Sequence, residues 1–174
     1  MHRKKLKEKN IVGVIKDNMQ DGFSLTLSPT LSYGSFIIGE NILSYKDVVI
    51  KDHTQGGEEG WYWDGYVATN SDYSIDIWCN KTNIIHTIRL VEHCYYQGRD
   101  IIGMNNFEAL ALLNIEPGDI NNDWRMSPRF GKKNREHHHV YYLYLPRTTL
   151  EIELWTWLKK VRAVLISDCS LDTL

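Results

Sequence analysis

Alternation of apolar and polar residues, interrupted by short turns, limits most strongly what this chain can fold into. A period of two is typical of half-buried strands, in which successive side chains point to opposite faces. The predicted strands cover Phe23–Ser28, Tyr73–Trp78, Asn83–Leu90, His139–Leu145, Thr149–Thr156 and Val161–Ser167. Because consecutive strands joined by short turns pair antiparallel, we expect a meander.

The central pair of these strands is predicted to form a hairpin around the turn Asn80–Asn83. Its packed face is expected to consist of four isoleucines, namely Ile75, Ile77, Ile85 and Ile88. The alternation is imperfect around Ile84 and Ile85, so the pattern leaves the register of this hairpin open.

Helical periodicity is scarce. One helix is predicted to begin at Asn105 or Asn106, whose side chain would cap the first turn, and to stop at Pro117–Gly118. Its buried stripe is expected to contain Phe107, Leu110 and Ala111, with Leu113 nearby. A second, single-turn helix is predicted over Glu40–Asp47.

The tripeptide Ile-Ile-Gly occurs twice, ending at Gly39 and at Gly103, each time before one of these helical segments. A phosphate-binding loop needs clustered glycines whose amides converge on an anion, and both glycines are solitary. We therefore expect each glycine to let the chain turn sharply from a strand toward a helix, with positive φ.

These elements predict an α+β fold: one domain over residues 1–174 with a large antiparallel sheet and one or two short helices. Residues 51–60 and 121–134 are expected to be loops, and the basic residues 1–9 to be a flexible terminal segment. The length allows a real core, and an apolar fraction of 43% and a charged fraction of 24% are ordinary for a globular protein.

The compartment is expected to be the cytoplasm. Three cysteines without CxxC spacing argue against a disulfide framework and for a reducing environment. The apolar run near the N-terminus is too short for a signal peptide, and no stretch is long enough to span a membrane.

Charge is distributed in blocks. Residues 3–9 hold five basic residues and one acid, residues 40–78 hold eight acids and two lysines, and residues 125–136 hold five basic residues and one acid. Such blocks are typical of solvated loops, but an acidic block can also face a basic partner.

The sequence Gly56–Asp72 places aromatic residues among acids within this acidic block. Tryptophan and tyrosine anchor protein contacts, and carboxylates attract a basic partner. The candidate partner-binding residues are Asp52, Glu58, Glu59, Trp61, Trp63, Asp64, Tyr66 and Asp72. The alternative is a strand whose aromatic residues belong to the core, and the sequence leaves both open for Trp61 and Trp63.

Two other functions remain as alternatives. Cys79, His86, His93 and Cys94 would suit a small enzyme with a Cys/His or metal centre if they came together, but they have no recognised ligand spacing. The basic and histidine-rich segment 125–139 would suit nucleic-acid binding. Neighbouring residues of a strand point to opposite faces, so His137, His138 and His139 cannot form one ligand set. We expect no catalytic residue, metal or cofactor.

Four segments carry a family resemblance. They read "SFIIGENILSYKD", "YSIDIWCNKTNIIHTIRL", "CYYQGRDIIGMNNFEALALLNIEP" and "LEIELWTWLKKVRAVLIS". Together they resemble bacterial immunity proteins found beside contact-dependent growth inhibition and Rhs-type polymorphic toxins. The resemblance implies a cytoplasmic protein that binds the C-terminal domain of its cognate toxin, often a nuclease, and blocks its active site without chemistry of its own. It assigns no individual binding residue.

Overall fold

The structure is a computed structural model that describes residues 24–27, 30–47, 49–56, 62–69, 74–126 and 135–171. It is mostly antiparallel β-sheet with a single α-helix in the part of the chain described. The expected large antiparallel sheet with a short helix is therefore confirmed. None of the helices in these ranges is long and apolar enough to cross a membrane.

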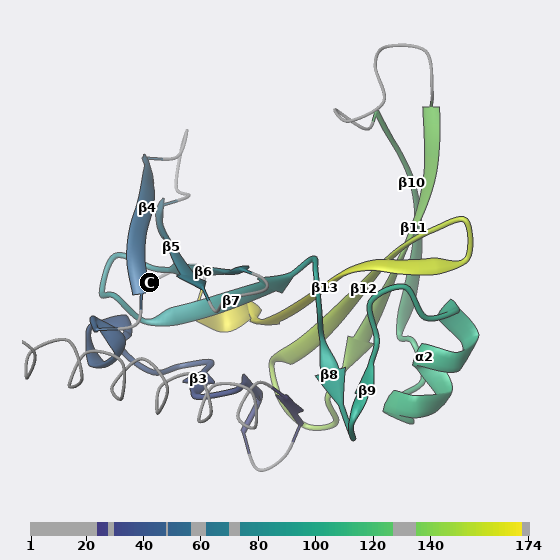
Figure 1. Cartoon of the computed structure of the whole chain (residues 1–174), viewed down its shortest axis with the longest axis horizontal. Helices are drawn as coiled ribbons and strands as arrows, with labels where there is room; N and C mark the ends of the chain where they lie inside the picture. The colour runs from purple at the N-terminus through teal and green to yellow at the C-terminus, as the bar shows by residue number, and fades with distance from the viewer. Residues whose placement is uncertain are drawn as a thin grey trace, which may run out of the picture.

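One eight-stranded sheet forms the body of the protein (Figure 1). Its strands, in sheet order, are β10 (Asp119–Met126), β11 (Arg135–Tyr144), β12 (Leu150–Trp157), β13 (Lys160–Asp168), β7 (Ile85–Leu90), β6 (Ser74–Cys79), β5 (Tyr62–Thr69) and β4 (Val49–Gly56). Every neighbouring pair is antiparallel. The predicted meander is thus present twice, once on each side of the β7–β13 pair.

Small elements lie on one side of this sheet, below it in Figure 1. They are β1 (Leu25–Thr26), β2 (Ser32–Tyr33), β3 (Phe36–Ile37), the 3-10 helix η1 (Ile42–Tyr45), β8 (Tyr95–Tyr96), β9 (Arg99–Asp100) and helix α2 (Asn106–Leu113). A second 3-10 helix, η2 (Cys169–Leu171), follows β13. The single-turn helix expected over Glu40–Asp47 corresponds to η1.

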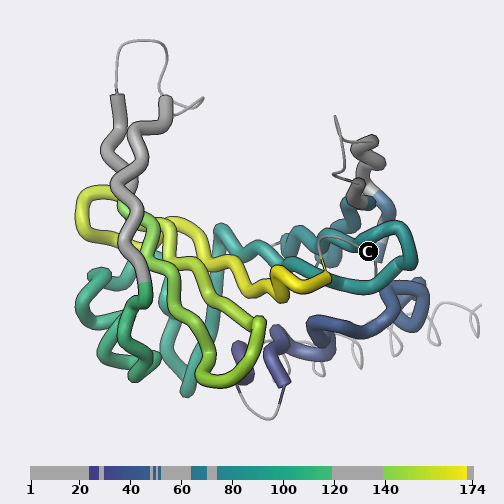
Figure 2. The backbone as a smooth tube through the Cα atoms, turned by 180° about the vertical axis from the view of Figure 1, so that it is seen from behind, coloured from purple at the N-terminus to yellow at the C-terminus, as the bar shows by residue number. Residues whose placement is uncertain are grey.

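The described part of the chain consists of two halves with the same order of elements: a two-stranded hairpin (β2–β3 or β8–β9), a helical segment (η1 or α2) and a four-stranded meander. The first half has β1 as an additional strand beside its hairpin. Figure 2 shows them side by side, the purple-to-teal half beside the green-to-yellow half. At their junction Leu90 pairs with Val164 and Ile88 pairs with Ile166. Each residue of β7 corresponds to the residue of β13 whose number is 76 higher, so Ile88 corresponds to Val164 and Leu90 to Ile166. Exchanging the two strands therefore turns the pair Leu90–Val164 into the pair Ile166–Ile88. An approximate two-fold axis therefore passes between β7 and β13.

Both Ile-Ile-Gly corners make the same backbone contacts. Gly39 has a φ of 92° and donates to Ile85 O at 2.8 Å, and Gly103 has a φ of 82° and donates to Val161 O at 2.8 Å. The amide of Ile42 then donates to Asn83 O, as that of Asn106 does to Lys159 O, both at 2.9 Å. The expected positive φ is confirmed, and each corner attaches a helical segment to the turn of a sheet hairpin.

The core lies between the sheet and the small elements. All four isoleucines predicted for the central hairpin are 0 or 1% exposed, and they pack with residues of both halves, among them Phe36, Leu143 and Ile152. A shift in register between Trp78 and Cys79 explains the imperfect alternation near Ile84 and Ile85.

Two local predictions are wrong. The expected loops over 51–60 and 121–134 contain most of β4 and β10, which are the edge strands of the sheet. Edge strands face solvent and tolerate polar, charged sequences, so their alternation is weak. Within the described residues 24–27, the strand expected over Phe23–Ser28 covers only Leu25–Thr26.

The predicted face of α2 is confirmed only in part. Leu113 is buried and Leu110 packs partly buried against the core, as expected, whereas Ala111 is exposed and Phe107 is 66% exposed. The backbone bond from Asn106 to Lys159 fixes the rotation of the helix, and this orients Phe107 away from the core. Asn105 is the N-cap, accepting from Phe107 N at 3.0 Å, and the helix ends before the left-handed Asn114 rather than at Pro117.

Candidate functional site

The predicted acidic and aromatic residues are only partly visible. The backbone of Asp52 lies in β4 and that of Trp63 in β5, whereas Glu58, Glu59, Trp61 and Asp72 lie outside the described residues. Of this block, the structure therefore shows only that Asp52 and Trp63 lie in two neighbouring antiparallel strands, β4 and β5.

Asp64 and Tyr66 face the core side of β5 and are 5% and 9% exposed. The Asp64 carboxylate accepts from Lys51 Nζ at 2.6 Å, and the same ammonium group lies 5.9 Å from the centre of the Tyr66 ring. A carboxylate that is buried and already paired is a poor mimic of a phosphate group, so Asp64 does not fit the role expected for it. Tyr66 was expected to be an anchor, and its low exposure leaves little of its side chain for a partner to contact.

Burial determines the protonation of three of the four cysteine and histidine candidates. Burial raises the pKa of the Cys79 thiol to about 12, with a further contribution from Asp64, and burial lowers the pKa of His86 to about 4. Burial also raises the pKa of the fully buried Cys94 thiol. Both thiols are thus held in their un-nucleophilic form. Within the described ranges no three His, Cys, Asp or Glu side chains lie close enough to hold a metal ion.

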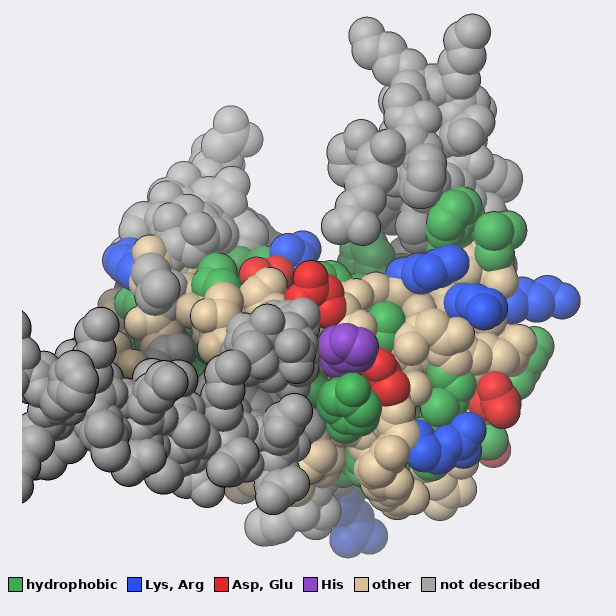
Figure 3. All heavy atoms as spheres, in the orientation of Figure 1, with side chains coloured by type: hydrophobic (Ala, Val, Ile, Leu, Met, Phe, Trp, Pro, Cys, Tyr) green, Lys and Arg blue, Asp and Glu red, His purple; other side chains and the backbone are tan. Residues whose placement is uncertain are grey.

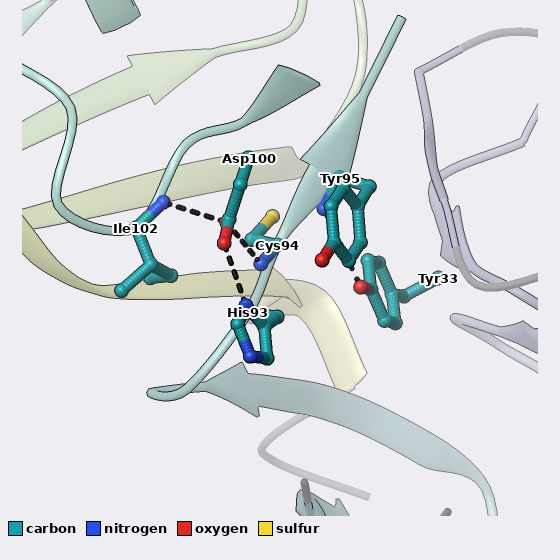
Figure 4. A network of polar contacts seen from close by, with 6 residues as sticks. All are labelled: Tyr33, His93, Cys94, Tyr95, Asp100 and Ile102. Atoms are coloured by element: carbon teal, nitrogen blue, oxygen red, sulfur yellow. Dashed lines mark hydrogen bonds and ion pairs between the residues drawn. The ribbon is translucent and has the colours of Figure 1, made fainter. Parts of the chain in front are cut away.

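His93 belongs to a network that organises the β8–β9 hairpin (Figure 4). Its Nδ1 lies 2.6 Å from one oxygen of Asp100, whose other oxygen accepts from Cys94 N at 2.9 Å and Ile102 N at 3.0 Å. Asp100 therefore ties both ends of the hairpin to the second Ile-Ile-Gly corner.

A hollow of about 510 Å³ opens between helix α2 and the β12–β13 turn. Its lining residues are Asn106, Phe107, His139, Tyr141, Leu158 and Lys159; we call it the α2 pocket. The volume lies within the range of ligand pockets in proteins. His139 is the part of the predicted basic and histidine-rich segment that reaches it, whereas residues 127–134 lie outside the described ranges.

Two large apolar side chains border the α2 pocket and face solvent. Phe107 is 66% exposed and Leu158 is 72% exposed, the two highest values among the exposed large hydrophobic residues of the described chain. Figure 3 shows hydrophobic side chains over the tip of the β12–β13 hairpin, beside basic ones. Exposed apolar side chains gathered around a hollow are typical of a contact surface.

The β12–β13 turn holds Leu158 in a strained conformation. Leu158 and Lys159 have φ values of 50° and 60°, in a two-residue turn between the paired Trp157 and Lys160. Asn-Gly is the favoured sequence for such a turn, and a branched residue there is strained by about 1–2 kcal/mol. Neither propensity nor burial therefore explains a leucine at this position.

Asn106 and Tyr141 are the buried residues among those that line the pocket, and we call them its base. This base contains an incompletely bonded amide. Asn106 is 4% exposed, and its Nδ2 donates to the Tyr141 hydroxyl at 2.7 Å. Its Oδ1 is buried without a hydrogen-bond partner. A buried acceptor left without a partner typically destabilises a fold by about 1–3 kcal/mol.

The first half of the chain provides an internal comparison for this site. Its corner residue equivalent to Asn106 is Ile42, which is 0% exposed, and the residue equivalent to Phe107 is Leu43. Tyr141 corresponds to Tyr66, because Tyr66 pairs with Ile77 and Ile77 with Ile88, as Tyr141 pairs with Leu154 and Leu154 with Val164. An isoleucine thus satisfies the same backbone geometry without a buried polar group.

No protein-family model, curated protein or solved structure matches this chain. The function of the α2 pocket must therefore be inferred from its own residues.

Sequence reasoning named Asn106 only as a possible helix cap and missed the pocket. A signal was present, since aligning the two Ile-Ile-Gly segments places Asn106 opposite Ile42 and Phe107 opposite Leu43. A polar residue opposite a core isoleucine is the kind of local inconsistency that marks functional positions. The contribution of Tyr141 and Leu158 depends on tertiary structure and leaves no such trace.

Proposed function

We propose that this protein is an immunity protein, which binds the C-terminal domain of a bacterial toxin and neutralises it without chemistry of its own. The four segments that resemble immunity proteins support this proposal, as does a surface suited to protein contact. The toxin domain is expected to be a nuclease whose active site the bound protein blocks.

The observation that carries the proposal is the exposed pair Phe107 and Leu158 beside the α2 pocket. Binding energy at protein interfaces is concentrated in a few apolar and aromatic side chains that become desolvated near hollows. Phe107 and Leu158 have this character, and Leu158 keeps it in spite of a strained backbone. We propose that they are the main apolar anchors for the toxin.

Acidic residues of the sequence 52–72 are proposed to steer the toxin. A nuclease holds a polyanion, so its cleft is expected to be basic, and carboxylates speed its association with a partner. Asp52, Glu58, Glu59 and Asp72 are the proposed acids, with Trp61 and Trp63 as neighbouring anchors. Asp64 is left out because it is paired with Lys51.

A growth assay tests the anchors. The toxin C-terminal domain encoded beside this chain is expressed with wild type or with Phe107→Asp, Leu158→Asp or Leu43→Asp. Aspartate is favourable in the first turn of a helix and is tolerated at positive φ, so the first two variants should fold. Leu43→Asp is the matched control, because Leu43 is 56% exposed at the equivalent position of the other half.

Protection should be lost with Phe107→Asp and Leu158→Asp and kept with Leu43→Asp, and affinity should fall by about 2 kcal/mol or more in the first two. Calorimetry on the purified proteins measures that change. Absence of any toxin gene beside this one, or full protection by both pocket variants, would contradict the proposal.

Charge reversal tests the steering. Glu58→Lys with Glu59→Lys should lower the association rate toward about 10⁵–10⁶ M⁻¹s⁻¹, the rate typical without electrostatic steering, and reduce its dependence on salt. Stopped-flow mixing at low and high salt measures both. Reversal at Arg129, Lys132 and Lys133 is the control and should change the rate less. Equal rates for wild type and the acidic variant would place the contact elsewhere.

A further inference from the structure

We propose that the α2 pocket binds a carboxamide group, the side chain of a glutamine or asparagine presented by the protein partner. This inference rests on the proposed function for the source of the group. It concerns the polar base of the pocket, whereas the apolar anchors Phe107 and Leu158 form its border.

The base presents an acceptor and a donor side by side. Asn106 Oδ1 is an acceptor without a partner. The Tyr141 hydroxyl accepts from Asn106 Nδ2, so its own hydrogen is left to be donated, and no acceptor for it is found among the described residues. A carboxamide carries the complementary pair, an N–H donor for Asn106 and a carbonyl acceptor for Tyr141.

Charged groups match this base less well. A carboxylate would be attracted to Lys159, which lines the pocket, but it would bring a second acceptor against Asn106 Oδ1. An ammonium or guanidinium group could donate to Asn106, but it cannot accept from Tyr141 and would meet the charge of Lys159. Purely apolar groups would leave the buried Oδ1 unsatisfied. A neutral carboxamide uses both polar atoms of the base.

The other half of the chain shows that the fold does not require this polar base. Ile42 occupies the same corner position, with the same backbone hydrogen bond to the hairpin turn. Asn106 is 4% exposed, close to the 0% of Ile42, so the two sites differ in chemistry and hardly in burial. A buried polar group that lowers stability at Asn106, where the equivalent position has an isoleucine, points to selection for binding.

The direct test uses small probes and the full chain alone. Proton–nitrogen spectra of the labelled protein are recorded during titration with N-acetyl-glutamine methylamide and, as matched control, N-acetyl-methionine methylamide. The Asn106 side-chain amide and the Phe107 backbone amide should shift saturably with the glutamine probe, at about millimolar concentration given its size. The methionine probe has a side chain of similar length without the amide and should produce no saturable shift.

Two variants keep this test decisive. Asn106→Ile copies the residue of the first half and should fold at least as well as wild type while losing the response to the glutamine probe. Tyr141→Phe removes the donor and should weaken the response, and it serves if Asn106→Ile does not fold. Equal responses to both probes in wild type, or a saturable glutamine response that survives in both variants, would overturn the inference.

A second arm separates this inference from the proposed function. Asn106→Ile should bind the toxin domain about tenfold more weakly than wild type, the size expected for a lost neutral hydrogen bond. Unchanged affinity in the folded variant would overturn the inference and leave the immunity function standing. Failure of wild type to bind any neighbouring toxin domain would overturn the immunity function, whereas the glutamine-probe result would still stand on the protein alone.

Discussion

The two halves of the chain use one backbone design with different side chains beneath their helical segments. In the first half Ile42 closes the corner with an apolar side chain, and in the second half Asn106 leaves an unsatisfied oxygen at the base of a pocket. The glycine corner, the asparagine cap and the bond to the hairpin turn are the same in both. Backbone contacts therefore suffice to position the helical segment, and the side chain below it is free to serve binding.

The hairpin turns beside these corners differ in the same direction. In the first half Asn80 is 1% exposed, and its side chain accepts from Thr82 and Ile84 and donates to Leu171 O. In the second half the turn exposes Leu158 at positive φ. One turn is optimised for stability, whereas the other combines strain with an exposed apolar side chain. The second half thus carries both features that reduce stability, the buried oxygen of Asn106 without a partner and the strained turn at Leu158.

Exchanging the two corner residues between the halves is expected to have the largest effect and tests whether Ile42 and Asn106 differ in their contribution to stability. Ile42→Asn should lower the free energy of unfolding by about 3 kcal/mol or more, because it removes buried apolar surface and buries an amide. Asn106→Ile should cause no loss and a gain of up to about 1 kcal/mol. Urea unfolding measures both, and similar losses in the two variants would show that Asn106 has a structural role.

The central hairpin was predictable because its isoleucines alternate over a fully packed face. Edge strands β4 and β10 were not, since half of an edge strand's environment is water and its sequence then looks like a loop. Phe107 was wrongly assigned to the buried face of the helix because its apolar character alone suggested burial, whereas the fold exposes it. The α2 pocket depends on residues from α2, β11 and the β12–β13 turn, and only the alignment of the two corners hinted at it.

Acid should destabilise the first half through His86. Burial lowers its pKa to about 4 in the folded state, against 6.5 for an ordinary histidine. The unfolded chain therefore binds a proton between about pH 6.5 and 4 that the folded chain does not, and stability falls as pH decreases through this window. The loss should be about 1–3 kcal/mol, reduced by the partial exposure of the ring.

The counterpart of His86 in β13 is Arg162, an exposed and permanently charged residue, so this sensitivity should belong to one half only. His86→Gln isolates the effect, because carboxylates contribute equally to the acid response of both proteins. Urea unfolding at pH 7 and pH 4.5 should show a smaller decrease for the variant. A decrease as large as that of wild type would mean that His86 is protonated in the folded protein.

Substitution of the corner glycines should have the smallest effect on stability, and it tests most directly whether the two halves are equivalent. Gly39 and Gly103 have positive φ, and a Cβ added at either would meet no atom within 4 Å. Alanine should therefore destabilise each corner through backbone conformation alone, by about 1 kcal/mol. The two corners bond to different hairpins, Gly39 to Ile85 O and Gly103 to Val161 O, so the double variant should lose about 2 kcal/mol. Urea midpoints at unchanged m-value measure these losses, and the folded fraction of Gly103→Ala should bind the toxin domain as wild type does. If one corner tolerated alanine and the other did not, the two corners would share the same hydrogen bonds but would not contribute equally to stability.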